Sequence, residues 1–262
     1  MPSASDRAPA IRAEDVWVTF RTTRERRSSL RGALAAVRDP AKRAVVIEAL
    51  RGVSFEVPAG SVYGMVGRNG AGKSTMLRTI AGILPPTAGR VTVWGRVTPL
   101  LSLGVGFNRD LTGRDNILLG GLTVGLEADE VYRHFDEVEE FAGLGDAINF
   151  PMRTYSSGMF GRLAFAVAAH LEPEILLVDE ALAAGDAAFK LKCMNKIAEL
   201  CSQDCTVVIV SHGLEVVKLL ADRCVWLDRG LVRMEASADE VVSAYLAEEQ
   251  IEESSTTALE DV

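Results

Sequence analysis

The chain has 262 residues, of which 48% are hydrophobic, enough for one large domain or two small ones with a substantial core. Its formal net charge of -8 argues against a general nucleic-acid binder, because affinity for the phosphate backbone depends on clustered Lys and Arg. The longest apolar run, at 163–171, is shorter than the roughly 18 to 20 residues that span a bilayer, and the first ten residues lack the apolar stretch of a secretory signal. We therefore expect a globular chain that stays in the cytoplasm and reaches a membrane only through a partner.

The four cysteines and three histidines do not form a metal-binding pattern. No two cysteines have C-x-x-C spacing, and the histidines are scattered along the chain. We expect buried or half-buried thiols in a reducing compartment, and no structural metal site.

The N-terminal quarter is predicted to form strands separated by an insertion. Alternating apolar residues predict a strand over 14–20 and two more within 52–67, around a Pro-Ala-Gly turn. Residues 21–46 between them are rich in arginine and alanine, and two interpretations stay open: a solvated, partly helical excursion, or a basic surface for a membrane or partner. The first ten residues are expected to be disordered.

The rest of the chain alternates helical and strand patterns. A helix that begins at Lys73 is stopped by Pro85-Pro86 and followed by a strand at 89–97, and 114–142 has helical spacing. The later predictions are a helix at 156–171, a strand at 174–180, a helix at 186–200, a strand at 205–212, a helix at 213–222, a strand pair across 225–233 and a helix at 237–247. Apolar strands that alternate with helices predict an α/β fold with a parallel sheet covered on both faces. The acidic segment 248–262 is expected to be disordered.

The stretch "GRNGAGKS", which begins at Gly67, matches the phosphate-loop pattern G-x-x-x-x-G-K-[ST]. It follows a predicted strand and opens a predicted helix, which is the context in which this pattern binds phosphate. Gly67, Gly70 and Gly72 allow backbone N–H groups to turn toward the phosphates. Lys73 is predicted to reach the β- and γ-phosphates, and Ser74 offers a hydroxyl to Mg²⁺.

Three further residues are predicted at the same edge of the sheet. Asp179 ends the strand "ILLVD", where parallel sheets keep their ligand crevice, so that it can hold Mg²⁺. Glu180 next to it can orient and deprotonate an attacking water. His212 follows the strand "TVVIV".

A second helix N-terminus is also prepared for an anion. In "YSSGMFGRLAF", residues 155–165, small hydroxyl residues and a glycine precede an apolar helical run. The chain therefore holds two helix starts suited to phosphate, which raises the question of whose phosphate the second one binds.

Five motifs, "GRNGAGKST", "YSSGM", "ILLVDE", "ALAAGD" and "SH", stand in the order found in ABC-type ATPases, and the resemblance covers about residues 11–235. More narrowly, "TYSSGMFGRLAFAVA", "DEALAAGDAAFKLKC" and "LLSLGVGFNRDLTGRDNI" resemble the nucleotide-binding subunits of bacterial polysaccharide exporters, the Wzt-type partners of a Wzm-type permease. The resemblance implies a P-loop NTPase fold over 11–247, with an antiparallel β subdomain and a helical signature subdomain at about 98–171.

The resemblance also implies roles for individual residues. Phe20 stands where the family has an aromatic residue that stacks on adenine, Asp186 matches the aspartate of the loop that joins two half-sites, and His212 matches the histidine that contacts the γ-phosphate. The other residues that the resemblance places at the nucleotide are Asn69, Ala71 and Thr75 of the phosphate loop and Ser156, Ser157, Gly158 and Met159 of the ABC signature.

The family resemblance implies a set of ligands and partners. The ligands are ATP and Mg²⁺, and the first partner is a second copy of the chain, packed head to tail so that each signature faces the other's ATP. A Wzm-type permease would anchor the pair at the cytoplasmic face of the cell membrane. The indirect cargo would be a lipid-linked galactan, O-antigen or teichoic acid, and no nucleic acid is expected.

Two features depart from the family pattern. Residues 91–116 contain no glutamine, although ABC proteins usually carry one there that links the nucleotide to the permease. Only about two dozen residues follow the start of the last predicted helix, too few for the carbohydrate-binding β-sandwich of roughly 100 residues that many such exporters append. We therefore expect no recognition of a glycan end by this subunit.

Two rival functions remain. One is a soluble ABC ATPase of DNA repair or translation, but that class usually fuses two ATPase domains or inserts long coiled coils, and this chain has one phosphate loop and no sustained heptads. The other is a non-catalytic nucleotide-binding regulator. The complete set of Lys73, Asp179, Glu180 and His212 argues against it.

Overall fold

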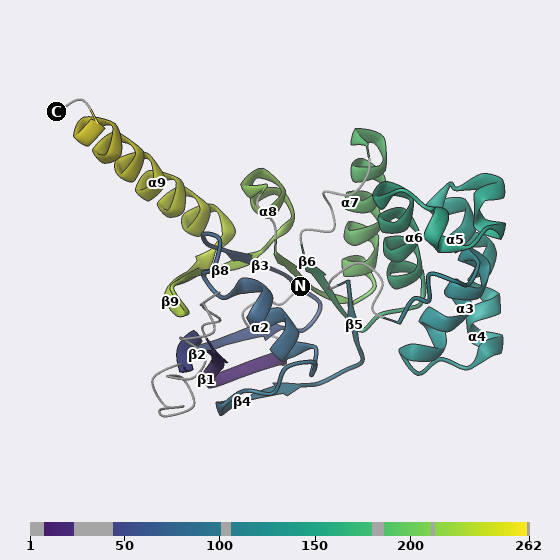
Figure 1. The fold of residues 1–262 in the computed structure, drawn as a ribbon, viewed down its shortest axis with the longest axis horizontal. Coiled ribbons are helices and arrows are strands. Elements are labelled where there is room, and N and C mark those ends of the chain that lie inside the picture. The colour runs from purple at the N-terminus through teal and green to yellow at the C-terminus, as the bar shows by residue number, and fades with distance from the viewer. Residues whose placement is uncertain (1–7, 24–43, 101–105, 180–185, 211–212, 261–262) are drawn as a thin grey trace, which may run out of the picture.

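The backbone forms two β-sheets with helices on both sides of the larger one (Figure 1). The structure is a computed structural model, and it describes residues 8–23, 44–100, 106–179, 186–210 and 213–260.

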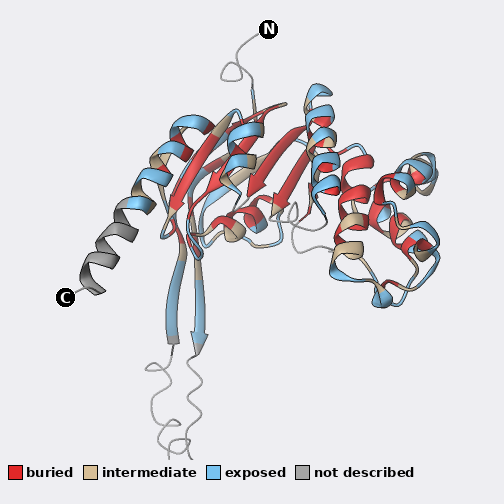
Figure 2. Cartoon of the chain, turned by 90° about the horizontal axis from the view of Figure 1, so that it is seen from above, coloured by how far each residue is buried: buried red, intermediate tan, exposed pale blue. Residues whose placement is uncertain are grey.

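The smaller sheet is antiparallel, in the strand order β2-β1-β4, with bounds Ala44–Pro58, Pro9–Thr23 and Ala88–Val93. Strands β1 and β2 stay paired from Pro9 opposite Pro58 to Thr23 opposite Ala44. Their far ends project from the body of the protein as an exposed two-stranded ribbon (Figure 2). The ends of the predicted insertion therefore belong to this ribbon, while 24–43 lies outside the described residues.

The larger sheet has the strand order β5-β6-β7-β3-β8-β9. The bounds in that order are Val97–Pro99, Ile175–Asp179, Thr206–Val210, Val62–Val66, Arg223–Asp228 and Leu231–Ser237. All neighbours are parallel except β8 and β9, which are antiparallel. The central strands β3 and β7 are buried along their whole length, because helices or the second sheet cover both of their faces (Figure 2).

Successive side chains of the parallel strands point to opposite faces of the sheet and pack into two separate hydrophobic cores. Val66, Val178 and Ile209 point to one face, and Met65 and Leu177 point to the other. The second face packs on helix α2 (Lys73–Ile80) and the small sheet. The phosphate loop therefore leads into a helix that is enclosed between two sheets.

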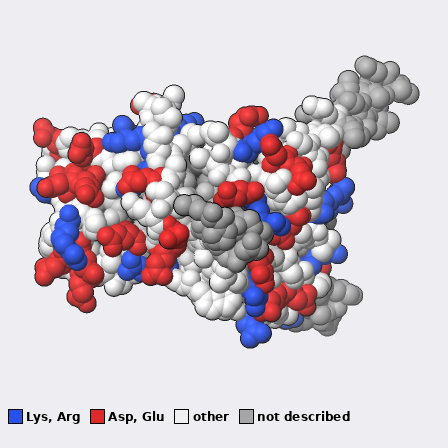
Figure 3. All heavy atoms as spheres, turned by 180° about the vertical axis from the view of Figure 1, so that it is seen from behind, with Lys and Arg blue, Asp and Glu red and all other residues white. Residues whose placement is uncertain are grey.

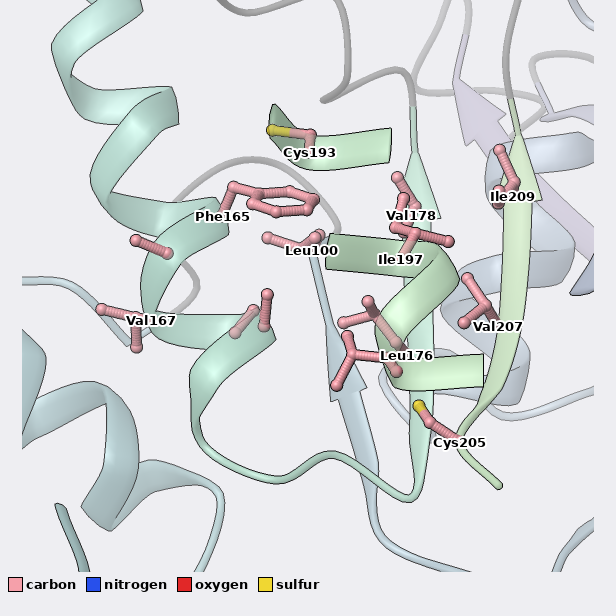
Figure 4. Close-up of a cluster of buried hydrophobic side chains, with 14 of the residues drawn as sticks. Leu100, Phe165, Val167, Leu176, Val178, Cys193, Ile197, Cys205, Val207 and Ile209 are labelled. Atoms are coloured by element: carbon pink, nitrogen blue, oxygen red, sulfur yellow. The ribbon is translucent and has the colours of Figure 1, made fainter. Parts of the chain in front are cut away.

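The first face is covered by α7 (Ala187–Ser202), α8 (Leu214–Leu220) and the beginning of α9 (Ala238–Glu260). Figure 4 shows the part of this core where α6 (Ser157–His170), α7 and strands β6 and β7 meet. The remaining helices form a group to one side of the sheet (Figure 1): α3 (Gly113–Thr123), α4 (Ala128–Arg133), α5 (Phe135–Ala142), the 3-10 turns η3 (Gly145–Asn149) and η4 (Met152–Thr154), and α6 (Ser157–His170).

Several predicted boundaries differ from the structure. Pro9 and Ala10 belong to β1, so the predicted disordered segment 1–10 was too long. The helical pattern at 114–142 is divided into three helices, with Gly125 at a φ of 88° in the first break. Helix α9 continues to Glu260, so the prediction that it ends near 247 was wrong, because its glutamate-rich extension favours helix once the buried first turns have nucleated it.

All four thiols are free, and three of them, Cys193, Cys205 and Cys224, are buried. Burial raises the pKa of each of these three to about 12, which leaves them protonated and inert.

The described residues contain no cluster of three or more His, Cys, Asp or Glu side chains that could hold a metal. None of the helices within the described ranges has both the length and the apolar character that crossing a membrane requires.

Candidate nucleotide-binding site

The phosphate loop connects the end of β3 to the start of α2, and its glycines are required by its shape. Gly67, Gly70 and Gly72 have φ values of 144°, 82° and 110°, in the left-handed region that side chains disfavour. A Cβ atom on Gly67 would collide with the backbone carbonyl oxygen of Leu227, and one on Gly72 would lie 2.7 Å from the carbonyl oxygen of Ala49. The backbone can curl tightly only because these positions carry no side chain.

Helix α2 begins without a side-chain cap from any described residue. Its N-cap is Gly72, whose carbonyl accepts the first helical hydrogen bond from Met76 at 2.8 Å. The first N–H groups of a helix have no partner within the helix, and the helix dipole places partial positive charge there. The start of α2 is therefore suited to an anion such as a phosphate.

Lys73 adds a full positive charge at this position. Its side chain is only 6% exposed, and its Nζ donates to the carbonyl oxygens of Gly67 at 2.5 Å and Arg68 at 3.1 Å. Both of these acceptors are neutral backbone carbonyls, and they hold the ammonium against the loop. A buried cation held this way attracts an anion strongly, because the surroundings screen it less than water does.

Asp179 lies at the same edge of the sheet as the loop. Strands β3, β7 and β6 are parallel neighbours, and Met65, Val210 and Asp179 occupy one row across them. Two strand spacings of nearly 5 Å separate the backbones of Met65 and Asp179 by about 10 Å. The half-buried carboxylate thus lies across the sheet edge from the loop that follows Met65.

The donor set at this edge fits Mg²⁺. Ser74, in the first turn of α2, supplies a hydroxyl and Asp179 a carboxylate, both of them hard oxygen donors. Magnesium in nucleotide sites is usually held by one or two such groups together with phosphate oxygens and waters, so two protein ligands suffice. Glu180 and His212, the predicted catalytic residues, lie outside the described residues.

The turn between β8 and β9 supports the loop from outside, a contact that the motifs in the sequence did not indicate. The N–H of Gly230 donates to the carbonyl of Ala71 at 2.9 Å, and the carbonyl of Gly230 accepts from the N–H of Arg51 at 2.8 Å. Gly230 has a φ of 80°, and a Cβ atom there would lie 2.8 Å from the carbonyl oxygen of Ala49. The Arg229-Gly230 turn in "LDRGL" was the available signal, but only the fold shows what the turn touches.

A cavity of about 330 Å³ lies beside this support, between the loop and α9. Its wall includes Trp226 and Tyr245, whose rings meet edge to face at 5.3 Å, and Arg233, which donates to Glu248 at 2.8 Å. Helix α9 is therefore anchored close to the outer side of the loop that begins at Gly67.

Phe20 is 40% exposed and lies just beyond the part of the small sheet that touches the loop. It is paired with Ile47 across the β1–β2 ladder. The ladder skips Ala49, whose carbonyl faces Gly72. Phe20 therefore lies on the strand pair that passes the phosphate loop, and its exposed ring is a surface on which a base could stack.

The second helix N-terminus, at α6, is capped by a side chain and faces outward. Ser156 is the N-cap, and its Oγ accepts from the N–H of Met159 at 3.2 Å. Ser156 and Ser157 are exposed. A Cβ atom on Gly158 would lie 3.8 Å from Ser156 Oγ. Leaving aside the chain neighbours of Gly158 and the backbone of its own helix, no other atom of the described residues would lie within 4 Å of that Cβ atom. The first turn of α6 is thus open to a group from outside.

Tyr155 fixes the chain just before this turn. Its hydroxyl donates to the carbonyl of Ala147 at 2.8 Å, and partial burial raises the pKa of Tyr155. A side chain on Gly113 would clash with that hydroxyl, so Gly113 makes room for the tyrosine.

Asp186, the predicted residue of the joining loop, is the exposed N-cap of α7, and its carboxylate accepts a hydrogen bond from the N–H of Phe189 at 2.8 Å.

A parallel sheet whose central strand runs into a glycine loop, a buried lysine and a helix start, with an aspartate at the same edge, defines a P-loop nucleotide-binding protein. A family model described as ABC transporter matches residues 50–183. The chain belongs to this family.

Similar proteins include ATP-binding proteins of O-antigen and teichoic acid export systems. An O-antigen export ATP-binding protein of Klebsiella pneumoniae is 43% identical, over 75% of this chain and 80% of its own length. One from Myxococcus xanthus is 46% identical, over 77% of this chain and 46% of its own length, so the chain spans about half of that relative. A teichoic acid export ATP-binding protein of Listeria innocua is 44% identical, over 75% and 58%.

Solved structures confirm the fold. A dimeric ATP-binding cassette in a post-hydrolysis state with ADP and Pi has a TM-score of 0.71 at 22% identity, covering 87% of this chain and 98% of that one. The ATP-binding subunit of an ABC transporter has a TM-score of 0.72 at 19% identity, covering 90% and 93%. The prediction of an ABC ATPase fold, with an antiparallel sheet and a helical part, is confirmed.

Proposed function

We propose that this protein is the ATP-binding and ATP-hydrolysing subunit of an ABC exporter that moves a lipid-linked polysaccharide across the cell membrane. The proposal rests mainly on the difference between the N-terminal ends of helices α2 and α6. Helix α2 opens in a complete phosphate loop with a buried lysine, whereas α6 opens outward with exposed serines and no described lysine bonded to it. One half of the site can bind ATP, and the other half is formed to complete a site on another molecule.

The phosphate loop would bind the phosphates of ATP. The first N–H groups of α2 and the ammonium of Lys73 favour the β- and γ-phosphates. Phe20 would stack on adenine, and Ser74 and Asp179 would hold Mg²⁺, which neutralises charge on the phosphate oxygens. Glu180 would orient and deprotonate the attacking water, and His212 would contact the γ-phosphate.

A second copy of the chain would complete the site. In this arrangement the first turn of α6, with Ser156, Ser157 and Gly158, contacts the γ-phosphate held by the partner copy. The helix dipole alone favours an anion there by roughly 0.3 to 2 kcal/mol. Dimeric cassettes among the solved structures of this fold support the proposal.

ATP would then hold the two copies together, and hydrolysis would release them. The closed dimer binds the nucleotide on two sides and the open one on one side, so the difference in affinity is what drives closure. A Wzm-type permease would couple closure to export and keep the subunit at the cytoplasmic face of the membrane. The cargo would be a lipid-linked polysaccharide, and the relatives' names support an O-antigen or a teichoic acid.

Glu180→Gln tests this function directly. The variant removes the base and keeps the shape, so we expect ATP hydrolysis to fall at least 100-fold while ATP stays bound and the dimer persists. Phosphate release and size-exclusion chromatography in Mg-ATP measure these two results. Lys73→Ala is the matched control, because it should lose hydrolysis, ATP binding and the ATP-dependent dimer together. Near-normal turnover of Glu180→Gln would contradict the assignment.

The two rivals make different predictions in the same assay. A DNA-repair or translation ATPase should be stimulated by DNA or ribosomes, although the face in Figure 3 carries several acidic patches, above all over the helical group, and no continuous basic surface among its described residues. A non-catalytic regulator should bind ATP and release no phosphate in either form.

A further inference from the structure

Three buried phenylalanine rings connect the signature helix to the helix that Asp186 caps. Phe141 of α5, Phe165 of α6 and Phe189 of α7 form this aromatic triad, and each is at most 7% exposed. Their centroids lie 5.7 Å apart for Phe141 and Phe165, 5.7 Å for Phe141 and Phe189, and 6.3 Å for Phe165 and Phe189. Phe189 meets both other rings edge to face, which is a favourable geometry for aromatic pairs.

Two cations hold the triad from outside. The guanidinium of Arg162, on α6, lies 4.8 Å from the ring of Phe189. The ammonium of Lys192, on α7, lies 4.5 Å from the ring of Phe141 and donates to the backbone carbonyl of the same residue at 3.1 Å. Each cation thus starts on one helix and contacts a ring on another, so it links the elements as well as stabilising the rings.

Phe189 also reaches the loop before α7. Its N–H donates to the carboxylate of Asp186 at 2.8 Å, while its side chain packs in the triad. The same residue therefore fixes the aspartate through its backbone and α6 through its ring. Figure 4 shows the adjoining contact, in which Phe165 reaches from α6 toward Cys193 of α7.

The packing makes the beginning of α7 and the middle of α6 move together. Aromatic rings in a close-packed core do not compress, so a displacement of either helix has to shift the other or open a void. Arg162 lies only four residues beyond Gly158, about one helical turn from the open end of α6. A shift of Asp186 would therefore be transmitted through Phe189 and Arg162 to the first turn of α6.

We propose that Phe189 is a positioning residue that couples Asp186 to the signature end of α6, so that the state of one ATP site in the dimer alters the other. The inference rests on the proposed function, in which Asp186 joins the half-sites and α6 completes the partner's site. Coupled sites of this kind give cooperative ATP hydrolysis.

The test compares Phe189→Leu with Ile197→Val in the full-length chain. Leucine removes the ring contacts, whereas Ile197, fully buried two turns further along α7 and outside the triad, controls for a simple loss of core packing. Phosphate release is measured against ATP concentration, together with the melting temperature. We expect a Hill coefficient near 2 for the unmodified protein and the control, and near 1 for Phe189→Leu, with kcat lowered about 5-fold and half-saturation changed less than 2-fold.

Two outcomes would overturn the coupling. One is an unchanged Hill coefficient in Phe189→Leu, and the other is an equal loss of cooperativity in Ile197→Val at a matched drop in melting temperature. Phe165→Leu, which breaks the same link from the α6 side, replaces Phe189→Leu if that variant does not fold. An unmodified protein that hydrolyses no ATP would contradict the proposed function itself, whereas one that hydrolyses ATP without cooperativity would overturn only the coupling.

Discussion

The first turns of α2 and α6 are both suited to phosphate, but they differ in what surrounds them. At α2 the loop is enclosed: Gly67 faces the Leu227 carbonyl, Gly72 faces the Ala49 carbonyl, and Lys73 is buried. At α6 the cap is a serine hydroxyl, and Gly158 has room beside it. The enclosed end can bind an anion with groups of its own chain, whereas the open end needs a surface brought from outside.

The enclosed start of α2 and the open start of α6 also differ in whether the fold requires their glycines. Glycine at α2 is required by the chain's own backbone, so changes there should affect the folded monomer. Glycine at α6 is not required by any described neighbour, so a change there should affect assembly and turnover and leave the monomer intact. Variants at the two ends therefore test the comparison directly.

Gly67→Ala should have the largest effect. The added methyl group meets the Leu227 carbonyl and has to adopt a φ of 144°, so we expect a loss of about 3 kcal/mol in the free energy of unfolding and no detectable ATP binding. Denaturant unfolding and nucleotide titration measure both. Gly70→Ala is the control, because its φ of 82° costs about 1 to 2 kcal/mol but, apart from Gly70 itself and its two chain neighbours, no described atom lies within 4 Å of the new methyl group. Equal losses in the two variants would show that the enclosure of α2 is unimportant.

Gly158→Asp should separate stability from turnover. A carboxylate in the first turn of a helix is stabilising, so the melting temperature should stay level or rise. The same charge would repel the γ-phosphate of the partner copy, and we expect hydrolysis to fall at least 10-fold, a barrier change of about 1.4 kcal/mol or more. Gln203→Glu adds an equal charge at an exposed position outside the site and should retain turnover. Full hydrolysis by Gly158→Asp would show that α6 does not face a phosphate.

The sequence predicted the phosphate loop, the hydroxyl residues at the start of α6 and Asp179 at its sheet edge because each depends on local spacing. The loop pattern needs only eight consecutive residues, and the position of Asp179 follows from the rule that parallel strands end at one edge. The predicted roles of Glu180 and His212 remain predictions, since neither lies in the described part of the chain.

The contacts of Gly230 and Phe189 could not be predicted in the same way. Gly230 supports Ala71 from more than 150 positions along the chain, and Phe189 finds its partners on two other helices. Such contacts follow from how the elements pack, and the hydrophobic pattern of one element carries no information about them. The length of α9 was missed for a different reason, because an acidic composition was interpreted as disorder although glutamate favours helix.

His170 provides the smallest test, at the buried end of α6. Its Nδ1 donates to the Ala166 carbonyl at 2.9 Å, its ring lies 4.8 Å from Phe141, and burial lowers its pKa. The unfolded chain therefore binds a proton more readily than the folded one as the pH falls through about 6.5, so stability is lost toward acid. Between pH 7.5 and 5.5 we expect the unmodified protein to lose more stability than His170→Gln, by less than about 1 kcal/mol.

Thermal unfolding at the two pH values measures this difference. The N-terminal end of α6 should be unaffected over the same range, because Ser156, Ser157 and Gly158 carry no titrating side chain. If acid weakened the unmodified protein and His170→Gln equally, other groups would account for the loss. If acid weakened the unmodified protein more than His170→Gln, α6 would be a helix with one end buried in the core and sensitive to a proton, and the other end open to a phosphate from outside.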